Sequence, residues 1–475
     1  MNILVLESST TSAKVMLYDT ADQAHTIETK AYPLYYDNAT LHNAESALME
    51  TAALGKKLCS GKRIDAVALS GTWHGVMLCD AGYRPVTPVY LWANTEPAEM
   101  CRRLREDDGY TRDYYQRTGC MVNAIYPAFK LKLFRERGCR LEDYHVADQG
   151  TYNNFRLTGE KTATDCMVSG AGLLNIRERR LDRAALDELG VSESNFARLV
   201  TYKDSCPLSE EGARLLGIEP GIPVIPACPD GALNQIGAGA LGRGIMTLSA
   251  GTSGAVRIAT PKPVLPDIPS TWCYLAPETW LSGAAISGCC NCVDWYKNKM
   301  FGPDKTYDEI ESAFESTFQG AAGTPVFLPF LFGERCPGWR DDRKAAFFDV
   351  TPLHTRHDLY HSVLEGVLFN LCQCYAVLTE INGVPKKVKL SGGIVNSLYW
   401  SQMCSDIFGL EMEVDSSQHG SLMGAAVLGM EKLGVIGGIS AFSVEARKKF
   451  RPNLKKAAMY REKYERYLHC YEKTK

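Results

Sequence analysis

The sequence has no long apolar run and no strong excess of either charge. No stretch of its 475 residues approaches the apolar length of a membrane span. The start, MNILVLESS, has neither the basic residues nor the apolar core of a secretory signal. The net charge is only −3, so no overall field draws the chain to nucleic acid or to an anionic membrane. We therefore expect a cytoplasmic protein that binds neither nucleic acid nor membranes.

Several site motifs are also missing. There is no GxxxxGK[ST] sequence, which argues against a P-loop kinase. The 17 cysteines are scattered, odd in number and without the paired CxxC motifs of structural zinc, so we interpret them as reduced thiols. His354, His357 and His361 open an expected helix with no second ligand group nearby. We interpret these histidines as surface or capping residues.

The sequence does contain a repeated hairpin. A strand at residues 3–6 runs into the turn ESSTTS (residues 7–12) and a return strand at 14–18. About half a chain later, a strand at 245–248 runs into the turn at 251–254, Gly-Thr-Ser-Gly. Turns of this kind offer N–H groups and hydroxyls to an anion. Two such hairpins converging on one nucleotide are typical of actin-like ATPases. We therefore expect an α/β protein with two actin-like (ribonuclease H-like) domains, residues 1–242 and 243–475, and a central cleft.

A single carboxylate lies just before the second hairpin. The apolar strand at 222–227 leads to Asp230, and a small-residue helix follows at 232–239. Open α/β sheets place their chemistry at the carboxyl ends of strands. An acid next to a phosphate-binding turn indicates phosphoryl transfer to a hydroxyl. The alternative is that Asp230 caps the helix, as an Asp in this position usually does.

Other loops follow strands in the same way. The strand at 64–70 ends in the loop Gly71-Thr72-Trp73-His74-Gly75, where His74 is either a ligand contact or a core histidine. The strand at 387–390 ends in Ser391-Gly392-Gly393. Long helices are predicted at 359–378 and 421–430, and the charged end, 455–475, is expected to pack as a peripheral helix or to fray.

Two further patterns have ordinary interpretations. The GxGxxG pattern at 237–242 follows a helix instead of a strand, so we assign it to close helix packing or to a domain hinge. We place the hinge for domain closure at residues 239–244. Lys448 and Lys449 are assigned to a solvated face.

The ordered set of these motifs resembles the FGGY carbohydrate kinases over about residues 2–432. The matching pieces are the first hairpin, the loop 71–75, Trp92, residues 157–160, 229–231, 251–254, 333–337, 364–366 and 391–393, Trp400 and residues 405–406. Residues 230–231 and 333–339 look most like gluconokinase-type members, and xylulokinase-type members are next.

The resemblance implies ATP-dependent, Mg²⁺-assisted phosphorylation with Asp230 as the catalytic base. The implied substrate contacts are Trp73, His74, Asn94, Asp230 and Gly231. The implied nucleotide contacts are Thr10, Thr11, Ser12, Lys14, Gly251, Thr252, Gly288, Gly392, Gly393 and Asn396, and Glu7 is the implied metal ligand. The implied partners are ATP and a small sugar or sugar acid, and a homodimer is a family expectation.

Two departures from the family pattern leave the substrate open. Glu7 stands where the family has Asp, and residues 92–96 read Trp-Ala-Asn-Thr-Glu in place of Trp-x-Asp-x-Arg. The second change removes a cation from a substrate-side loop, which weakens the case for an acidic sugar. We expect a gluconate-like acceptor, with a ketopentose such as xylulose or another polyol as the alternative. A non-catalytic, nucleotide-binding sugar sensor also remains open because of Glu7.

Overall fold

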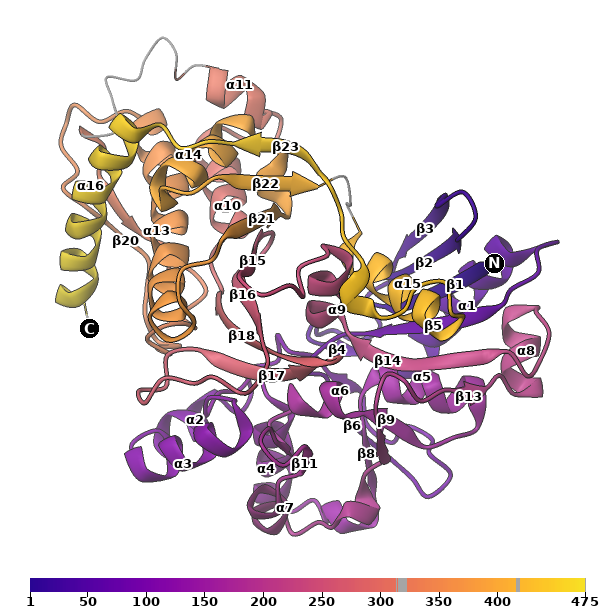
Figure 1. Cartoon of the computed structure of the whole chain (residues 1–475). Helices are drawn as coiled ribbons and strands as arrows, with labels where there is room; N and C mark the ends of the chain where they lie inside the picture. Colours follow the sequence, from indigo (N-terminus) through magenta and orange to yellow (C-terminus); the bar gives the residue numbers. More distant parts are fainter. Residues whose placement is uncertain (313, 315–322, 416–418, 475) are drawn as a thin grey trace.

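The computed structural model describes residues 1–312, 314, 323–415 and 419–474, and they form two mixed sheets with helices around them (Figure 1). The first sheet has the strand order β13-β14-β5-β1-β2-β3. Its strands are β1 (Asn2–Ser8), β2 (Ser12–Asp19), β3 (His25–Ala31), β5 (Ala66–Gly71), β13 (Cys206–Pro207) and β14 (Pro223–Pro229). β1, β2 and β3 are antiparallel, whereas β5 runs parallel to β1, and β14 runs parallel to β5.

The second sheet repeats this pattern, in the order β17-β18-β16-β15-β21-β22-β23. Its strands are β15 (Ile245–Ala250), β16 (Gly254–Thr260), β17 (Trp272–Ala276), β18 (Thr279–Ile286), β21 (Lys387–Ser391), β22 (Met412–Asp415) and β23 (Ala446–Phe450). β15, β16 and β18 are antiparallel, and β21 and β22 are parallel to β15. The last strand, β23, is antiparallel, as β13 is in the first sheet. The predicted α/β repeat is therefore confirmed, and it extends over both whole sheets.

Helices and short ribbons cover the sheets. The helices are α1 (Ala44–Cys59), α2 (Ala98–Leu104), α3 (Asp108–Thr118), α4 (Pro127–Glu136), α5 (Gln149–Thr158), α6 (Asp165–Ser169), α7 (Arg183–Leu189), α8 (Glu210–Leu216), α9 (Asp230–Gly237), α10 (Cys290–Met300), α11 (Tyr307–Ser312), α13 (Arg356–Asn382), α14 (Leu398–Phe408), α15 (Gly420–Lys432) and α16 (Leu454–Lys473). The ribbons pair β4 (Leu41–His42) with β7 (Val89–Tyr90), β6 (Met77–Cys79) with β8 (His145–Ala147), β9 (Thr162–Thr164) with β12 (Arg198–Val200), β10 (Leu174–Asn175) with β11 (Arg180–Leu181), and β19 (Val326–Leu328) with β20 (Ala346–Phe348).

Helices α9 and α15 pack directly against each other between the two sheets (Figure 1). A Cβ on Gly237 would lie 2.1 Å from the Gly420 carbonyl oxygen, and a Cβ on Gly424 would lie 2.0 Å from that of Leu233. The backbones meet so closely that only glycine fits at these positions. The packing interpretation of the GxGxxG pattern is thus confirmed.

Helix α15 comes from beyond the expected domain boundary at Gly242, yet it packs on the first sheet. Leu422 and Ala425 share a buried cluster with Ile3 and Val5 of β1. The second half of the sequence therefore completes the core of the first sheet. The boundary near Gly242 separates the strands of the two sheets, and as a division into domains it stays a prediction.

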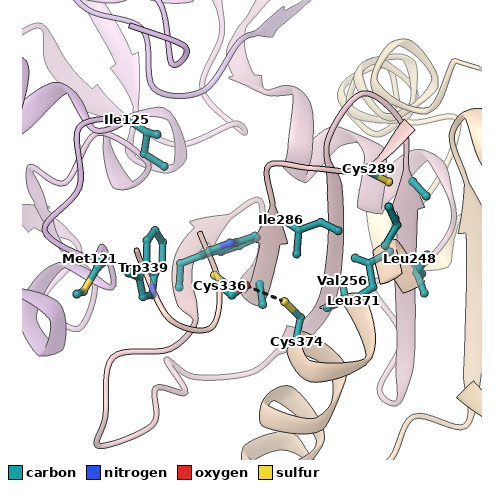
Figure 2. Packing of buried hydrophobic residues seen from close by; sticks show 14 of the residues in the cluster. Met121, Ile125, Leu248, Val256, Ile286, Cys289, Cys336, Trp339, Leu371 and Cys374 are labelled. Carbon is teal, nitrogen blue, oxygen red and sulfur yellow. Dashed lines mark hydrogen bonds between the residues drawn. The ribbon is translucent and has the colours of Figure 1, made fainter. Parts of the chain in front are cut away.

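A second, larger core joins the two halves. Figure 2 shows the loop that carries Cys336 and Trp339, with Met121 of the first half on one side and Cys374 of α13 on the other. The thiol of Cys374 donates to the carbonyl oxygen of Cys336. All 17 cysteines are free thiols, as predicted. By length and composition α13 qualifies as a membrane span, contrary to our expectation, but 72% of its most apolar window is buried in the protein.

One further expectation changes, and another is confirmed. His361 is fully buried and lies 3.2 Å from the Glu365 carboxylate, so the surface or capping interpretation is wrong for this histidine. The charged C-terminal segment forms α16, at the outer edge of the second half beside α13 (Figure 1). It is peripheral as expected, but Tyr460, Tyr467 and Tyr471 bury one of its faces.

Candidate active site

Asp230 lies at the carboxyl end of β14, as the first residue of α9. Its Oδ1 accepts hydrogen bonds from the backbone N–H groups of Gly231 (2.8 Å) and Trp73 (3.4 Å). The N-cap is Pro229, and no side chain caps the helix, so the capping alternative for Asp230 is wrong. Within the described chain, its Oδ2 has no hydrogen-bond partner. This oxygen is therefore available to a ligand.

The environment of Asp230 makes it more basic than an ordinary carboxylate. Burial raises its pKa to about 6, and the negative charge of Glu7 adds to the rise. The N–H groups of Gly231 and Trp73 and the charge of Arg257 oppose it. A pKa near the operating pH is suited to a general base.

Glu7 is buried at the end of β1, where the parallel strand β5 also ends. Its Oε1 accepts from Lys14 at 2.8 Å, and its Oε2 accepts from the Ser70 hydroxyl at 2.8 Å. A carboxylate has about four lone-pair sites, so both oxygens can accept further contacts. The Glu7 carboxylate can therefore still accept the predicted metal ion. Lys14, a predicted nucleotide contact, is already paired with this carboxylate.

Trp73 contacts Asp230 through its backbone N–H group, and its ring is buried inside the protein. The Trp73 ring is buried, and its Nε1 donates to the Cys166 carbonyl at 3.0 Å. A Cβ on Gly231 would lie 2.6 Å from this ring, which explains the Asp230-Gly231 pair as a packing requirement. A direct sugar contact by Trp73 or Gly231 stays a prediction.

His74 is held as a neutral hydrogen-bonding group. Its Nδ1 lies 2.5 Å from the Gly170 carbonyl oxygen, which can only accept, so Nδ1 carries the proton. Burial lowers the pKa of His74 to about 3, and the charges of Arg335 and Lys130 lower it further. Its Nε2 is then a fixed acceptor, suited to a hydroxyl donor.

Asn94 and its loop are fastened to neighbouring side chains. The buried Asn94 amide donates to the Thr40 hydroxyl and to Glu96, each at 3.1 Å. Glu96 in turn pairs with Arg137 at 2.7 Å. The amide is therefore occupied within its own loop, and its predicted substrate contact has no support in these hydrogen bonds.

Two cavities lie beside the second hairpin turn, and both are lined by Gly251, Thr252, Gly393 and Asn396. The smaller measures about 600 Å³ and the larger about 930 Å³. The larger cavity is also lined by Gly392, Arg447 and Lys448. Lys448 therefore borders a cavity instead of lying only on a solvated face.

The remaining predicted nucleotide residues divide into two groups. Thr10 and Thr11 form the tip of the first turn, and Ser12 begins β2. The Thr10 hydroxyl already accepts from Trp92 at 3.2 Å. Gly288 is buried, and a Cβ there would lie 2.1 Å from the Pro329 carbonyl oxygen. Its glycine has a packing reason, and its contact with the nucleotide stays a prediction.

Family models match both halves of this chain. The N-terminal domain of the FGGY family of carbohydrate kinases matches residues 2–237, and the C-terminal domain of that family matches residues 246–432. The chain belongs to the FGGY family of carbohydrate kinases. It is therefore a phosphotransferase by family, as the ordered motifs predicted.

Individual relatives of this FGGY kinase cover most of its length. It is 27% identical to a gluconokinase of Bacillus subtilis (strain 168), over 93% of this chain and 89% of the relative. It is 28% identical to a xylulose kinase of Escherichia coli (strain K12), over 77% and 75%. The crystal structure of a gluconate kinase from Lactobacillus acidophilus has the same fold, with a TM-score of 0.93, 24% identity and coverage of 99% and 97%.

The structure also brings up residues that the sequence analysis did not select. Tyr126 and Tyr274 share a hydroxyl hydrogen bond of 2.6 Å, and the ring of each packs against His74. The charge of Arg335 lowers the pKa of His74, and the charge of Arg257 lowers that of Asp230. Arg335 lies within the family motif at 333–337, but nothing in the sequence places it near His74, or Arg257 near Asp230.

Proposed function

We propose that this FGGY kinase transfers the γ-phosphoryl group of ATP to a hydroxyl of a gluconate-like sugar acid. The observation that carries the proposal is Asp230, a carboxylate at the end of β14 with one oxygen fixed by two backbone N–H groups and the other without a described partner. The similarity to the gluconokinase of Bacillus subtilis supports the acceptor class.

In the proposed reaction Asp230 acts as the general base. Its Oδ2 accepts the proton of the substrate hydroxyl while the hydroxyl oxygen forms a bond to the γ-phosphorus of ATP. The bond between that phosphorus and the ADP oxygen breaks at the same time. Trp73 and Gly231 hold Oδ1, which fixes the direction in which Oδ2 points. His74 Nε2 accepts from another hydroxyl of the sugar.

The proposed nucleotide site comprises the two cavities that meet at Gly251 and Thr252. The N–H groups and hydroxyls of the two hairpin turns would hold the phosphates. Arg447 and Lys448 add positive charge at the border of the larger cavity.

A Mg²⁺ ion fits this donor set. Among the described residues there is no group of three or more His, Cys, Asp or Glu side chains that could hold a metal by itself. Mg²⁺ in phosphoryl transfer usually takes one or two carboxylates together with phosphates and waters. Glu7 would supply the carboxylate, and the bound ion would neutralise charge on the phosphates.

The alternative acceptor is a ketopentose such as xylulose or another polyol, which the similarity to the xylulose kinase of Escherichia coli favours. ADP release from Mg²⁺-ATP across gluconate, xylulose, ribulose, erythritol and glycerol decides between these acceptors. Asp230→Asn should abolish the response and retain ATP binding. If the variant behaves as the wild type, the base assignment is wrong. If neither protein turns over any acceptor while both bind ATP, the non-catalytic sensor is the better description.

Domain closure about residues 239–244 and a homodimer belong to the same proposal. Closure would exclude water, which competes with the acceptor hydroxyl. X-ray scattering with and without nucleotide plus acceptor should differ, and identical curves would contradict closure. Sedimentation equilibrium measures the oligomeric state in the same samples.

A further inference from the structure

Arg257 projects from the second sheet toward α9 and Asp230. It pairs across the strands with Thr247, whose hydroxyl donates to Gln235 of α9 at 2.6 Å. Cross-strand partners share a face of the sheet, so Arg257 points to the side where α9 lies. One Nη of Arg257 donates to the Ser249 hydroxyl at 3.1 Å on that same face.

An aromatic wall continues from Arg257 to His74. Arg257 and Trp272 flank Gly283 in neighbouring strands, and a Cβ on Gly283 would lie 2.2 Å from the Trp272 ring. Trp272 stacks on Tyr274 with 4.3 Å between ring centroids, and Tyr274 lies 5.6 Å from the His74 ring. The arginine therefore belongs to the same wall as the proposed sugar contact.

Arg335 reaches this wall from a rigid loop. The next residue, Cys336, donates its backbone N–H to the Ala285 carbonyl of β18 at 3.0 Å, and its carbonyl accepts from Cys374 (Figure 2). The charge of Arg335 contributes to lowering the pKa of His74, after the larger effect of burial. The loop thus anchors Arg335 beside β18, close enough to His74 for its charge to act on that ring.

Neither arginine has a carboxylate partner within 4 Å among the described residues. Their Nε atoms are buried and, in that part of the chain, have no hydrogen-bond partner. Burial lowers the pKa of Arg257; the negative charge of Asp230 opposes this, and the positive charge of Arg335 adds to it. Two half-buried cations close to each other are costly unless an anion joins them.

We infer that Arg257 and Arg335 together bind the carboxylate of a sugar acid substrate and so select it over neutral sugars. The planar guanidinium is suited to a two-point contact with a carboxylate. The inference rests on the proposed function and names the group on the substrate that this site recognises.

The other anion available is the γ-phosphoryl group of ATP. The two cavities around the phosphate turn do not include Arg257 or Arg335 among the described residues that line them. The charge of Arg335 instead acts on His74 and Tyr126, which belong to the proposed sugar wall. The position favours the carboxylate, and the two sources are separable by experiment.

The test compares an acidic with a neutral acceptor in Arg257→Gln and Arg335→Gln. With gluconate, kcat/KM should fall between about 10-fold and about 100-fold in each variant, because a hydrogen-bonded charge is lost. With xylulose, at about pH 8 where Asp230 is deprotonated in every variant, kcat/KM and the KM for ATP should stay within about threefold, since the lost contact is to a group that xylulose lacks. Arg335→Lys should recover part of the loss with gluconate.

Arg340→Gln is the matched control, because Arg340 lies in the same loop and is exposed to solvent. It should leave both acceptors unchanged. An equal loss with both acceptors would assign the arginines to the phosphoryl group and overturn the inference. No loss with gluconate would do the same, as would a wild-type enzyme that accepts only neutral sugars.

If the wild type uses gluconate alone, calorimetric titration with gluconate in the absence of nucleotide replaces the neutral acceptor. The two Gln variants should then lose gluconate binding and keep ATP binding, and retention of gluconate binding would overturn the inference. A wild type that turns over no acceptor contradicts the proposed function, and the same titration still decides the role of the arginines.

Discussion

The two halves have the same strand connectivity, but the equivalent loops carry different residues. β1 and β15 each begin an antiparallel hairpin and each pair with one parallel strand, β5 and β21 respectively. β5 ends in the loop with Trp73 and His74, whereas β21 ends in Gly392 and Gly393. Bulky side chains fill the first loop, whereas Gly392 and Gly393 border the larger cavity, and a Cβ on Gly392 would lie 2.5 Å from the Ala250 carbonyl oxygen.

The two hairpin turns also differ in how far their side chains are already paired within the protein. In the first turn, Glu7 pairs with Lys14 and the Thr10 hydroxyl accepts from Trp92. In the second turn, Thr252 has no side-chain hydrogen bond to another described residue, and it borders both cavities. A duplicated scaffold thus provides two equivalent turns, and they differ in how many of their side chains are already paired within the protein.

The largest expected effect is a pH dependence of the rate, which should follow Asp230 of the first half. Asp230 must be deprotonated to act as a base, so the single-turnover rate should fall as pH decreases through about 6. Well below that pH, the rate should fall about tenfold per pH unit. Quench-flow measurements with both substrates saturating give the profile, and near-UV circular dichroism shows that the fold persists. A flat profile would contradict the base assignment.

Next in size is a change where the two halves touch. Gly424→Ala places a Cβ 2.0 Å from the Leu233 carbonyl oxygen and should destabilise the protein by about 1–3 kcal/mol. Helix propensity alone predicts the opposite sign, because Ala is the better helix former. Denaturant unfolding measures the change. Gly437→Ala is the control, since a Cβ there meets nothing within 4 Å, and equal effects in both variants would rule out the close contact.

A smaller effect should rank the two turns against each other. Thr252→Val removes a hydroxyl that no described residue occupies, and it should raise the KM for ATP about tenfold. Thr10→Val should raise it less, about threefold, because that hydroxyl already accepts from Trp92. Steady-state kinetics at saturating acceptor provide both values. If Thr10→Val has the larger effect, the first turn is the principal phosphate contact.

The smallest effect concerns the charge of Glu7. Because Glu7 contributes to the raised pKa of Asp230, Glu7→Gln should move the acid limb of the pH profile to lower pH. The readout is the midpoint and not the amplitude, since Glu7 is also the proposed metal ligand. Glu28→Gln is the control, because Glu28 lies on β3, which β2 separates from the strand of Glu7. A shift to higher pH would contradict the electrostatic coupling between Glu7 and Asp230.

The sequence predicted those features that depend on neighbouring residues. The two hairpins were visible because strand, turn and return strand are contiguous, and Asp230 because it directly follows a strand. The return of α15 to the first sheet was not predictable, since its small residues indicate a close partner without saying which. Arg257 and Arg335 are far apart in sequence and come together only through strand register and the anchored loop.

The C-terminal helix α16 anchors the loop that carries Arg335. The Tyr471 hydroxyl donates to Glu334 at 2.6 Å, and Arg343 pairs with Glu334 at 2.9 Å and donates to the Tyr471 carbonyl and the Thr474 hydroxyl. Glu334 immediately precedes Arg335, so the last turn of α16 holds the loop that carries this arginine. During synthesis, a chain that has not yet reached Thr474 lacks these anchors. Translation products that end before Tyr471 would therefore leave the Arg335 loop without the anchors that α16 supplies.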